Sequence, residues 1–452
     1  MKFKSTFALG TVLVGGVIGV YLLDFKPGEE KKVIDELSTK LIQLESEDIA
    51  VVKLTSEHGT VSLSKNDRGE FIINSPVRAK GDKNAINSLI RAAERIKKER
   101  EVTSGEHVNL AQYGLQPPLI ELHFFLNDSS LTGFSLGVEN PTGEYVFASV
   151  TGDDKVFIIP KSIYSQTNKK LFDLRDKNIL SFKSKDVSKI FVKTKKYEYE
   201  INRLGNEFLM VKPVELILES GKVNSLLSRL SNGKARKFID SEQPAEDITG
   251  LVEAETAIRL EISNQPGHLQ LAIGRSLSDG GKAYRYAKDA SRSTIMLIDS
   301  SLAELLGKKP FELIKKEVLS FDKDKIDAID IRYGDVELNL TKDGSVWNVT
   351  RPENFTADAD KVDELLGKFL MLKASAVEEY DPKGFNGYVD NLPDLTIILY
   401  QDSLEANFIR VGKKVGDESF LKSGGSPPIY RILNNAVEKL KVSAEYFRKE
   451  ES

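Results

Sequence analysis

The chain repeats one pattern of glycine, proline and apolar residues three times along its 452 residues. Ile49, Val187 and Ile326 occupy the same place in successive copies and lie 138 and 139 residues apart. A period of this length is that of a whole domain, because solenoid repeats are only about 20 to 50 residues long. The sequence therefore predicts three tandem domains of similar fold.

Each copy keeps its turn and helix markers in the same order. A turn glycine precedes a short apolar strand, a proline ends that strand, and a residue pair ending in lysine opens a helix. The markers are Gly69, Pro76 and Asp82-Lys83, then Gly205, Pro213 and Gly221-Lys222, then Gly344, Pro352 and Asp360-Lys361. The first helix places Ile86, Leu89, Ile90, Ala93 and Ile96 on one face, and the third does the same with Val362, Leu365, Leu366 and Phe369. Such a face must pack on a sheet.

Two glycines mark the second half of each copy, one where it begins and one to which the following strands lead. These glycines are Gly114 and Gly137, Gly250 and Gly274, and Gly387 and Gly412. In the first copy, residues 119–125, 131–136, 145–150 and 155–159 predict strands, and a closing helix follows at 160–169. Short hairpin links without a βαβ crossover predict an α+β fold: an N-terminal transmembrane helix followed by three tandem antiparallel sheet-plus-helix repeats of about 138 residues.

The domain boundaries follow from where each copy opens. We expect a tail and anchor over 1–28, a first repeat with a short helical stalk over 29–176, a second over 177–315 and a third over 316–452. No Ser/Gly-rich linker separates the repeats, so neighbours are expected to pack together. The apolar residues predicted to form the seam between domains are Ile179, Leu180, Phe182, Leu319 and Phe321.

The N-terminal segment Ser5–Leu23 contains nineteen residues and no charge. As a helix it would be roughly 30 Å long, the thickness of a bilayer core. A cleaved signal peptide is the alternative, but bulky residues stand where a peptidase needs small ones, which favours an uncleaved anchor. The apolar residues assigned to the anchor are Phe7, Leu9, Val12, Leu13, Val17, Ile18 and Leu22.

Lys2 and Lys4 predict that the N-terminus stays cytoplasmic and that the rest of the chain is extracytoplasmic, carried on the cytoplasmic (inner) membrane. Gly15 and Gly19 have the GxxxG spacing that lets two membrane helices pack closely. Glycine is also common in membrane helices for other reasons, so both homodimerisation through the anchor and a lone anchor remain open.

Composition excludes several kinds of chemistry. The chain has no cysteine, which rules out disulfides, thiolate metal sites and cysteine nucleophiles. Its 64 basic and 68 acidic residues are well mixed, so no basic stripe predicts binding to nucleic acid. The four histidines are scattered without metal-ligand spacing, and Gly280-Gly281-Lys282 lacks the other parts of a P-loop. We therefore predict no catalytic residue, no cofactor and no metal.

One basic run stands out in the first repeat. Arg91, Arg95, Lys97, Lys98 and Arg100 alternate with Glu94, Glu99 and Glu101. Opposite charges three or four residues apart on a helix commonly pair. Ion pairs along the helix face are therefore the expected explanation of this run, without an anionic ligand.

Three motifs stand out in the first repeat, namely Tyr113-Gly114-Leu115, Gly137-Val138-Glu139-Asn140-Pro141 and Tyr145-Val146-Phe147-Ala148. Chiefly in these motifs, the chain over about residues 1 to 185 resembles an uncharacterised bacterial family called domain of unknown function 4340. Thr249-Gly250-Leu251 and Asn386-Gly387-Tyr388 are weaker copies of the first motif. The resemblance implies a single-pass envelope protein, often encoded beside ABC-type permeases and gliding-motility-like auxiliary subunits, and it implies no catalytic residues.

Two hypotheses of function follow from these features. The leading one is a non-enzymatic, membrane-anchored extracytoplasmic scaffold or accessory subunit of an ABC-transporter-like envelope complex, with permease and auxiliary subunits as partners. The alternative is a module that binds an envelope polymer such as glycan or peptidoglycan. Aromatic residues repeated on one exposed sheet face of all three copies would favour the alternative. A hydrolase ranks third, because the residue constellations it needs are missing.

Overall fold

The computed structural model describes residues 39–103, 108–242, 244–385, 387–389, 393–424 and 428–449. The predicted anchor, including Gly15 and Gly19, lies outside these residues. Across the described ranges, no helix is both long and apolar enough to cross a membrane. The chain divides into two compact units, 1–177 and 178–452, of which the first holds one repeat and the second holds two.

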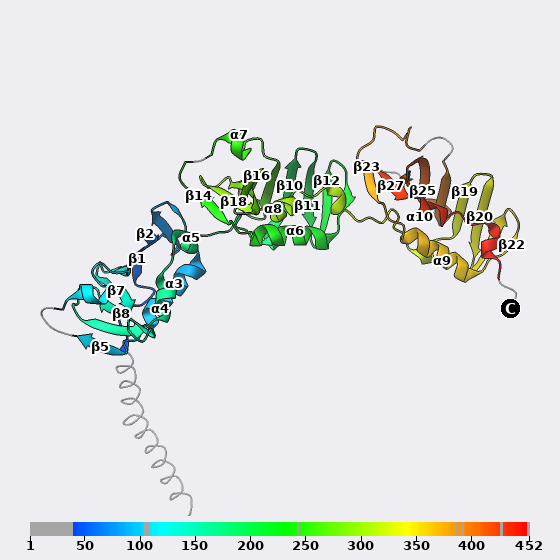
Figure 1. Cartoon of the computed structure of the whole chain (residues 1–452). Helices are drawn as coiled ribbons and strands as arrows, with labels where there is room; N and C mark the ends of the chain where they lie inside the picture. The colour runs from blue at the N-terminus through cyan, green and yellow to red at the C-terminus, as the bar shows by residue number, and fades with distance from the viewer. Residues whose placement is uncertain are drawn as a thin grey trace, which may run out of the picture. The chain divides into compact units, whose positions relative to one another are not determined.

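The first repeat is a nine-stranded antiparallel sheet with helices packed on it (Figure 1). Its strand order is β4-β3-β2-β1-β6-β7-β8-β9-β5. The strands are β1 (Ile49–Ser56), β2 (Gly59–Lys65), β3 (Phe71–Ser75), β4 (Ala79–Lys80), β5 (Arg100–Thr103), β6 (Ile120–Leu126), β7 (Leu131–Glu139), β8 (Tyr145–Val150) and β9 (Val156–Pro160). The helices are α3 (Lys83–Arg95), the 3-10 helix η2 (Leu110–Tyr113), α4 (Ser162–Thr167) and α5 (Leu171–Leu174).

The second repeat has the same order, β13-β12-β11-β10-β15-β16-β17-β18-β14. Its strands are β10 (Val187–Thr194), β11 (Glu198–Leu204), β12 (Glu207–Lys212), β13 (Leu216–Ile217), β14 (Lys237–Ile239), β15 (Thr256–Ile262), β16 (His268–Asp279), β17 (Lys282–Asp289) and β18 (Ile295–Asp299). Its helices are η3 (Ser184–Asp186), α6 (Ser220–Asn232), α7 (Glu246–Thr249), α8 (Ser300–Leu306) and η4 (Pro310–Glu312).

The third repeat again has this order, β22-β21-β20-β19-β24-β25-β26-β27-β23. Its strands are β19 (Ala328–Tyr333), β20 (Val336–Asp343), β21 (Val346–Arg351), β22 (Phe355–Thr356), β23 (Ala376–Glu379), β24 (Leu395–Gln401), β25 (Leu404–Val415), β26 (Glu418–Ser423) and β27 (Ile429–Leu433). Its helices are η5 (Lys323–Lys325), α9 (Ala359–Leu370), α10 (Asn434–Glu438) and η6 (Ala444–Phe447). Three sheets of one topology confirm the predicted tandem antiparallel repeats.

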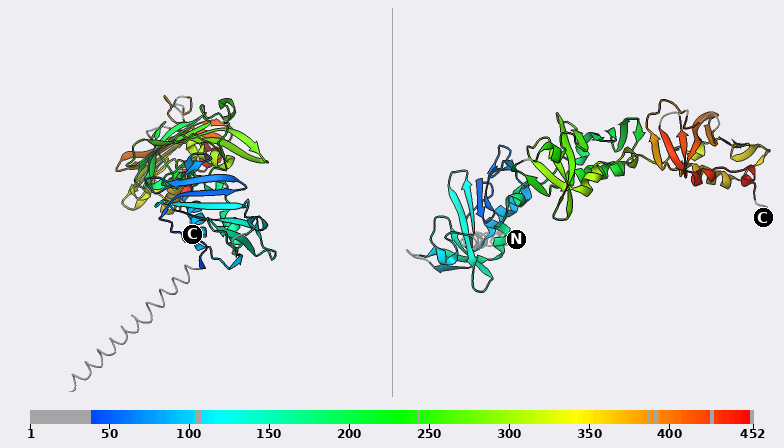
Figure 2. Two further views of the ribbon diagram at one scale, coloured as in Figure 1. Left: turned by 90° about the vertical axis from the view of Figure 1, so that its left-hand side faces the viewer. Right: turned by 45° about the horizontal axis from the view of Figure 1, so that its top comes forward.

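The long helix of each repeat packs on one face of its own sheet. In α3 the side of the helix that packs is the one that its apolar spacing predicts. Ile86, Leu89, Ile90 and Ala93 of α3 are buried, as are the corresponding residues of α6 and α9. In Figure 2 the green helices and the orange-to-red helices again lie on one side of their own sheets. Burial of a leucine or isoleucine side chain contributes roughly 1.5 to 3 kcal/mol, so this face anchors the helix.

The segment that closes each repeat returns to the start of the long helix. The N–H of Asp82 donates to the carbonyl of Leu174 at 2.7 Å in the first repeat. Glu219 and Asp358 donate in the same way, each at 2.8 Å, to Leu313 and Phe447. This bond satisfies a donor at the helix N-terminus that has no partner inside the helix. It also covers one edge of the sheet, beside the two-residue strands β4, β13 and β22.

The two repeats of unit 178–452 follow each other without a spare residue. The N–H of Lys315 donates to Ile217 of the second repeat at 3.3 Å, and the carbonyl of Lys316 accepts from Ala374 of the third at 2.8 Å. The side chain of Tyr380, which follows β23, also packs on the apolar core of this unit, with its hydroxyl beside the main chain of Phe311. The main-chain pairing therefore changes from one repeat to the next between Lys315 and Lys316, where the predicted boundary lies.

Candidate functional site

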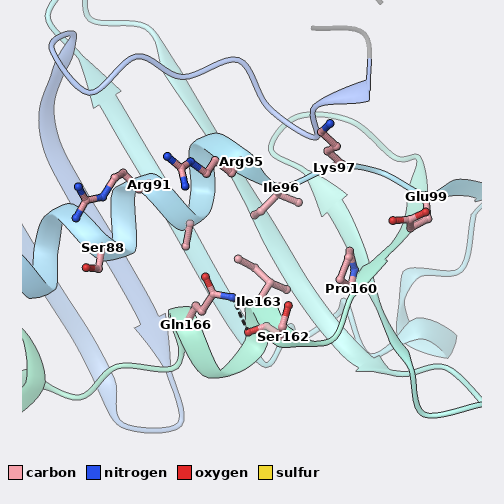
Figure 3. Close-up of a pocket in the computed structure, with 11 residues that line it drawn as sticks. Ser88, Arg91, Arg95, Ile96, Lys97, Glu99, Pro160, Ser162, Ile163 and Gln166 are labelled. Atoms are coloured by element: carbon pink, nitrogen blue, oxygen red, sulfur yellow. Dashed lines mark hydrogen bonds between the residues drawn. The ribbon is translucent and has the colours of Figure 1, made fainter. Parts of the chain in front are cut away.

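A pocket in the first repeat lies between α3 and α4 (Figure 3). It encloses about 460 Å³. Helix α3 and the strand-like segment after it supply one side, and α4 with Pro160 supplies the other. The side chains that line it are Ser88, Arg91, Ala92, Arg95, Ile96, Lys97, Glu99, Pro160, Ser162, Ile163 and Gln166.

Helical spacing explains why these side chains share the hollow. Ser88, Arg91 and Arg95 are three and four residues apart, which places them along one side of α3. Figure 3 shows Ile96 and Ile163 turned toward each other between the helices, and each is only 5% exposed. Gln166 donates to the carbonyl of Ser162 at 3.2 Å, one turn of α4 earlier. The pocket therefore has an apolar floor and a polar rim.

The charge of the rim is positive and uncompensated. Arg91, Arg95 and Lys97 form no ion pair with any residue in the described ranges, although three glutamates lie near them in sequence. Glu94 instead accepts a hydrogen bond from the hydroxyl of Ser46, and the carboxylate of Glu101 lies 3.9 Å from the ammonium of Lys155. The predicted ion pairs along the helix face are thus wrong, because Glu94 and Glu101 find partners outside the helix, in the turn before β1 and in the loop before β9.

The two arginines of this rim belong to the first repeat alone, whereas Lys97 has counterparts in Lys234 and Lys373. The buried residues Ile86, Val223 and Val362 align the three long helices. In this alignment Arg91 corresponds to Ser228 and Gly367, and Arg95 corresponds to Asn232 and Met371. Since the other repeats fold with the same topology without these arginines, the fold does not require them.

A second hollow, of about 270 Å³, lies on the open face of the second sheet. The guanidinium of Arg259 stands 3.9 Å from the ring centroid of Phe191, its cross-strand partner. A stacked arginine of this kind gains roughly 0.5 to 1 kcal/mol at an exposed site. The matching positions on β1 and β19 are Lys53 and Asp330. The stacked pair is therefore not repeated.

The third repeat holds a lysine that is only 3% exposed, Lys422 of β26. Its ammonium donates to the carbonyl of Ser423 at 2.9 Å and lies 5.0 Å from the ring centroid of Phe385. Burial, and then the charge of Arg410 on the adjacent strand, lower the pKa of Lys422 to about 8. Since these two contacts join it to a carbonyl and an aromatic ring of its own repeat, we assign it a structural role.

The predicted seam residues lie where each later repeat opens. Ile179, Leu180 and Leu319 are buried, and Phe182 and Phe321 are half-buried against the same apolar core. The N–H of Ile179 donates to the carbonyl of Gly233 at 3.0 Å, within its own repeat. The structure therefore places Ile179 in the repeat that it opens, and the role of these residues in fixing the angle between domains stays a prediction.

The described ranges hold no group of three or more histidine, aspartate and glutamate side chains arranged to bind a metal ion. His58 lies 3.8 Å from the carboxylate of Glu57, a single exposed contact. His123 lies on β6 opposite Gly133. His107 lies outside the described residues.

The structure corrects one detail of the repeated glycine motif. The edge of the Tyr113 ring meets Phe147 with centroids 4.9 Å apart, and Tyr388 meets Phe420 in the same way at 5.0 Å. Tyr388 therefore takes the place of Tyr113, whereas the sequence alignment had placed Gly387 with Gly114. The shared tyrosine could have shown this in the sequence. Likewise, the presence of Arg91 and Arg95 in only one of the three long helices could have revealed the basic pocket.

Comparison with known families gives one finding. The family model described as "Domain of unknown function (DUF4340)" matches residues 72–246, 209–346 and 347–451. Each match begins in the third strand of a repeat, namely in β3, β12 or β21. No curated protein matches the chain. The threefold match is independent evidence for the repeat seen in the three sheets.

Proposed function

The chain belongs to the family of the domain of unknown function DUF4340, and we propose that it is a membrane-anchored, non-enzymatic scaffold or accessory subunit of an ABC-transporter-like envelope complex. The observation that carries this proposal is the serial repetition of one nine-stranded fold, with the main-chain pairing passed from Lys315 to Lys316. Such a chain presents similar surfaces several times over, as repeat proteins that bind partners do.

The surfaces available differ from one repeat to the next. The first repeat carries the basic rim of Arg91 and Arg95, and the second carries the stacked Phe191 and Arg259. Side chains that depart from the common pattern of a repeat are where separate contacts arise, because the fold itself does not demand them. This supports contact with more than one partner subunit.

The membrane anchor is part of the proposal and rests on the uncharged stretch Ser5–Leu23. Lys2 and Lys4 before it favour a cytoplasmic N-terminus and an extracytoplasmic remainder. The partner class, a permease with its auxiliary subunits, comes from what the family resemblance implies. The polymer-binding alternative gains no support, because Phe191 has Lys53 and Asp330 at its matching positions.

Affinity purification after cross-linking in intact membranes tests this function. We expect the full chain to recover an integral-membrane permease together with its ATPase. A variant lacking residues 316–452 provides the comparison, since it retains the anchor and loses one repeat. Recovery of no membrane protein by the full chain, with the chain behaving as a lone monomer, would refute the proposal.

A further inference from the structure

We propose that the pocket between α3 and α4 binds the phosphate headgroup of an anionic lipid, an inference that rests on the proposed membrane anchor. The pocket joins two features that such a ligand needs. Arg91, Arg95 and Lys97 supply positive charge along the rim, and Ile96 and Ile163 supply an apolar floor. A phosphate ester on a hydrocarbon body satisfies both, whereas a bare inorganic anion uses only the rim.

The guanidinium groups suit phosphate for a geometric reason. Arginine presents planar paired N–H donors that match two phosphate oxygens. Arg91 and Arg95 are exposed and four residues apart, so one turn of α3 carries both groups. Against these two arginines and Lys97, the pocket contains one carboxylate, that of Glu99. The rim is therefore net positive, and its cations form no ion pairs with described residues.

Chain connectivity also places the pocket within reach of the membrane. The N–H of Lys98 donates to the carbonyl of Thr39 at 2.9 Å, and Lys40 forms a β-bridge with Lys97. The chain thus enters the described part of the structure beside a residue that lines the pocket. Fifteen residues lie between Leu23 and Thr39, and the sixteen steps from one to the other, at about 3.5 Å each, reach at most about 55 Å.

The absence of the two arginines from the other long helices agrees with a single site near the proposed anchor. Ser228 and Asn232 replace the two arginines in α6, and Gly367 and Met371 replace them in α9. What is confined to the repeat next to the predicted anchor is the pair of arginines four residues apart, and not positive charge in general. The contrast also supplies a matched control, because α6 carries two cations of its own, Lys222 and Arg229, which line neither the pocket between α3 and α4 nor the hollow on the second sheet.

The test is titration of the full chain, in a neutral detergent, with short-chain phosphatidylglycerol. Phosphatidylcholine of the same chain length and inorganic phosphate are the comparison ligands, and native mass spectrometry counts the bound molecules. We expect one phosphatidylglycerol per chain, bound at least about tenfold more tightly than phosphatidylcholine. The variant Arg91→Gln/Arg95→Gln should lose this preference, and Lys222→Gln/Arg229→Gln should keep it, with both variants melting like the wild type.

Three results would overturn the inference. They are an unchanged preference in Arg91→Gln/Arg95→Gln, an equal loss in the control variant, and inorganic phosphate binding as tightly as the lipid, which would identify a soluble phosphate ligand instead. The proposed anchor fails in a different experiment, if cell fractionation recovers the chain in the soluble fraction. A pull-down that finds no permease would contradict the scaffold function and leave the lipid titration unaffected.

Discussion

Gly137 lies so close to Tyr113 that a Cβ atom on Gly137 would stand 2.0 Å from the main-chain carbonyl oxygen of Tyr113. Gly274 meets the carbonyl of Thr249, and Gly412 meets that of Tyr388, at the same 2.0 Å. In every repeat a strand therefore presses against the turn that precedes the second half of the sheet. Only glycine allows this contact, because any side chain would overlap the carbonyl oxygen.

Replacing this glycine should destabilise its repeat. We expect Gly412→Ala to lower the free energy of unfolding of the third repeat by about 1 to 3 kcal/mol, since the added methyl group must push backbone apart. Trp347 is the single tryptophan of the chain and is 6% exposed in the same repeat, so its fluorescence during urea denaturation reports this change. Gly137→Ala should leave the Trp347 transition in place and shift only part of the circular dichroism signal.

The control for this series is Gly221→Ala, in helix α6. A Cβ on Gly221 would meet nothing within 4 Å, and alanine is favoured over glycine in a helix by up to about 1 kcal/mol. This variant should be as stable as the wild type or more stable. If Gly412→Ala behaved in the same way, the close contact with Tyr388 would not constrain the fold.

Truncating Tyr380 should uncouple the two repeats of unit 178–452. The side chain packs on the shared apolar core, and burial raises the pKa of its hydroxyl, which lies beside the main chain of Phe311. Tyr380→Ala removes a half-buried ring, so we expect a loss of roughly 1 to 3 kcal/mol. Tyr380→Phe keeps the ring and should lose about 1 kcal/mol or less.

The measurement is the separation of two denaturation curves. In Tyr380→Ala the Trp347 fluorescence transition should part from the circular dichroism transition, because the third repeat then unfolds on its own. In the wild type and in Tyr380→Phe the difference between the two curves should be smaller. Identical separation in all three proteins would argue against coupling through Tyr380.

Lys422 should make the third repeat more stable as the pH rises above 8. Its folded-state pKa is about 8, against 10.5 for the ordinary side chain, so between these values the folded protein binds fewer protons than the unfolded chain. The free energy of unfolding then increases with pH, by up to about 3 kcal/mol at completion. Below pH 8 the lysine is charged in both states and burial of the charge opposes folding throughout.

The corresponding variant is Lys422→Met, which removes the titrating group and keeps the hydrocarbon. It should be more stable than the wild type at pH 7, and its Trp347 denaturation midpoint should lack the rise between pH 8 and 10. Lys414→Met, at a residue whose side chain is 55% exposed, controls for the loss of one charge. Parallel pH profiles for wild type and Lys422→Met would contradict the depressed pKa.

The absence of cysteine makes the predicted topology easy to test. Asn206 lies in the exposed turn between β11 and β12, so Asn206→Cys provides one reactive thiol. A membrane-impermeant maleimide applied outside the cytoplasmic membrane should label this variant without lysis. Labelling only after the cells are permeabilised would place the repeats in the cytoplasm and refute the proposed orientation.

The sequence predicted the features that depend on local signals. Turn glycines such as Gly69, Gly205 and Gly344 have φ values of 72°, 62° and 59°, which explains why they mark the same turn in each copy. The apolar spacing of α3 correctly identified the buried face. These signals lie within a few neighbouring residues, and the threefold repetition made each of them visible three times.

Long-range pairing was harder to predict. The edge strand β5 has only four residues and pairs Arg100 with Ile158, and the strand β4 has two and pairs Lys80 with Ile72. Because both strands are so short, neither shows an alternating pattern of its own. The basic rim was misread for a related reason. The sequence places Glu94 beside Arg91 and Arg95, whereas the hydroxyl that engages Glu94 belongs to Ser46, far away along the chain.

The change of pairing between Lys315 and Lys316 has a mechanical meaning. A flexible linker would lengthen under tension by straightening. Here Lys315 is hydrogen-bonded to Ile217 of the second repeat, and Lys316 to Ala374 of the third. Tension across the unit must therefore break main-chain hydrogen bonds before it can gain length. The second and third repeats should therefore transmit a pulling force from one to the other, as a stiff link does, without extending.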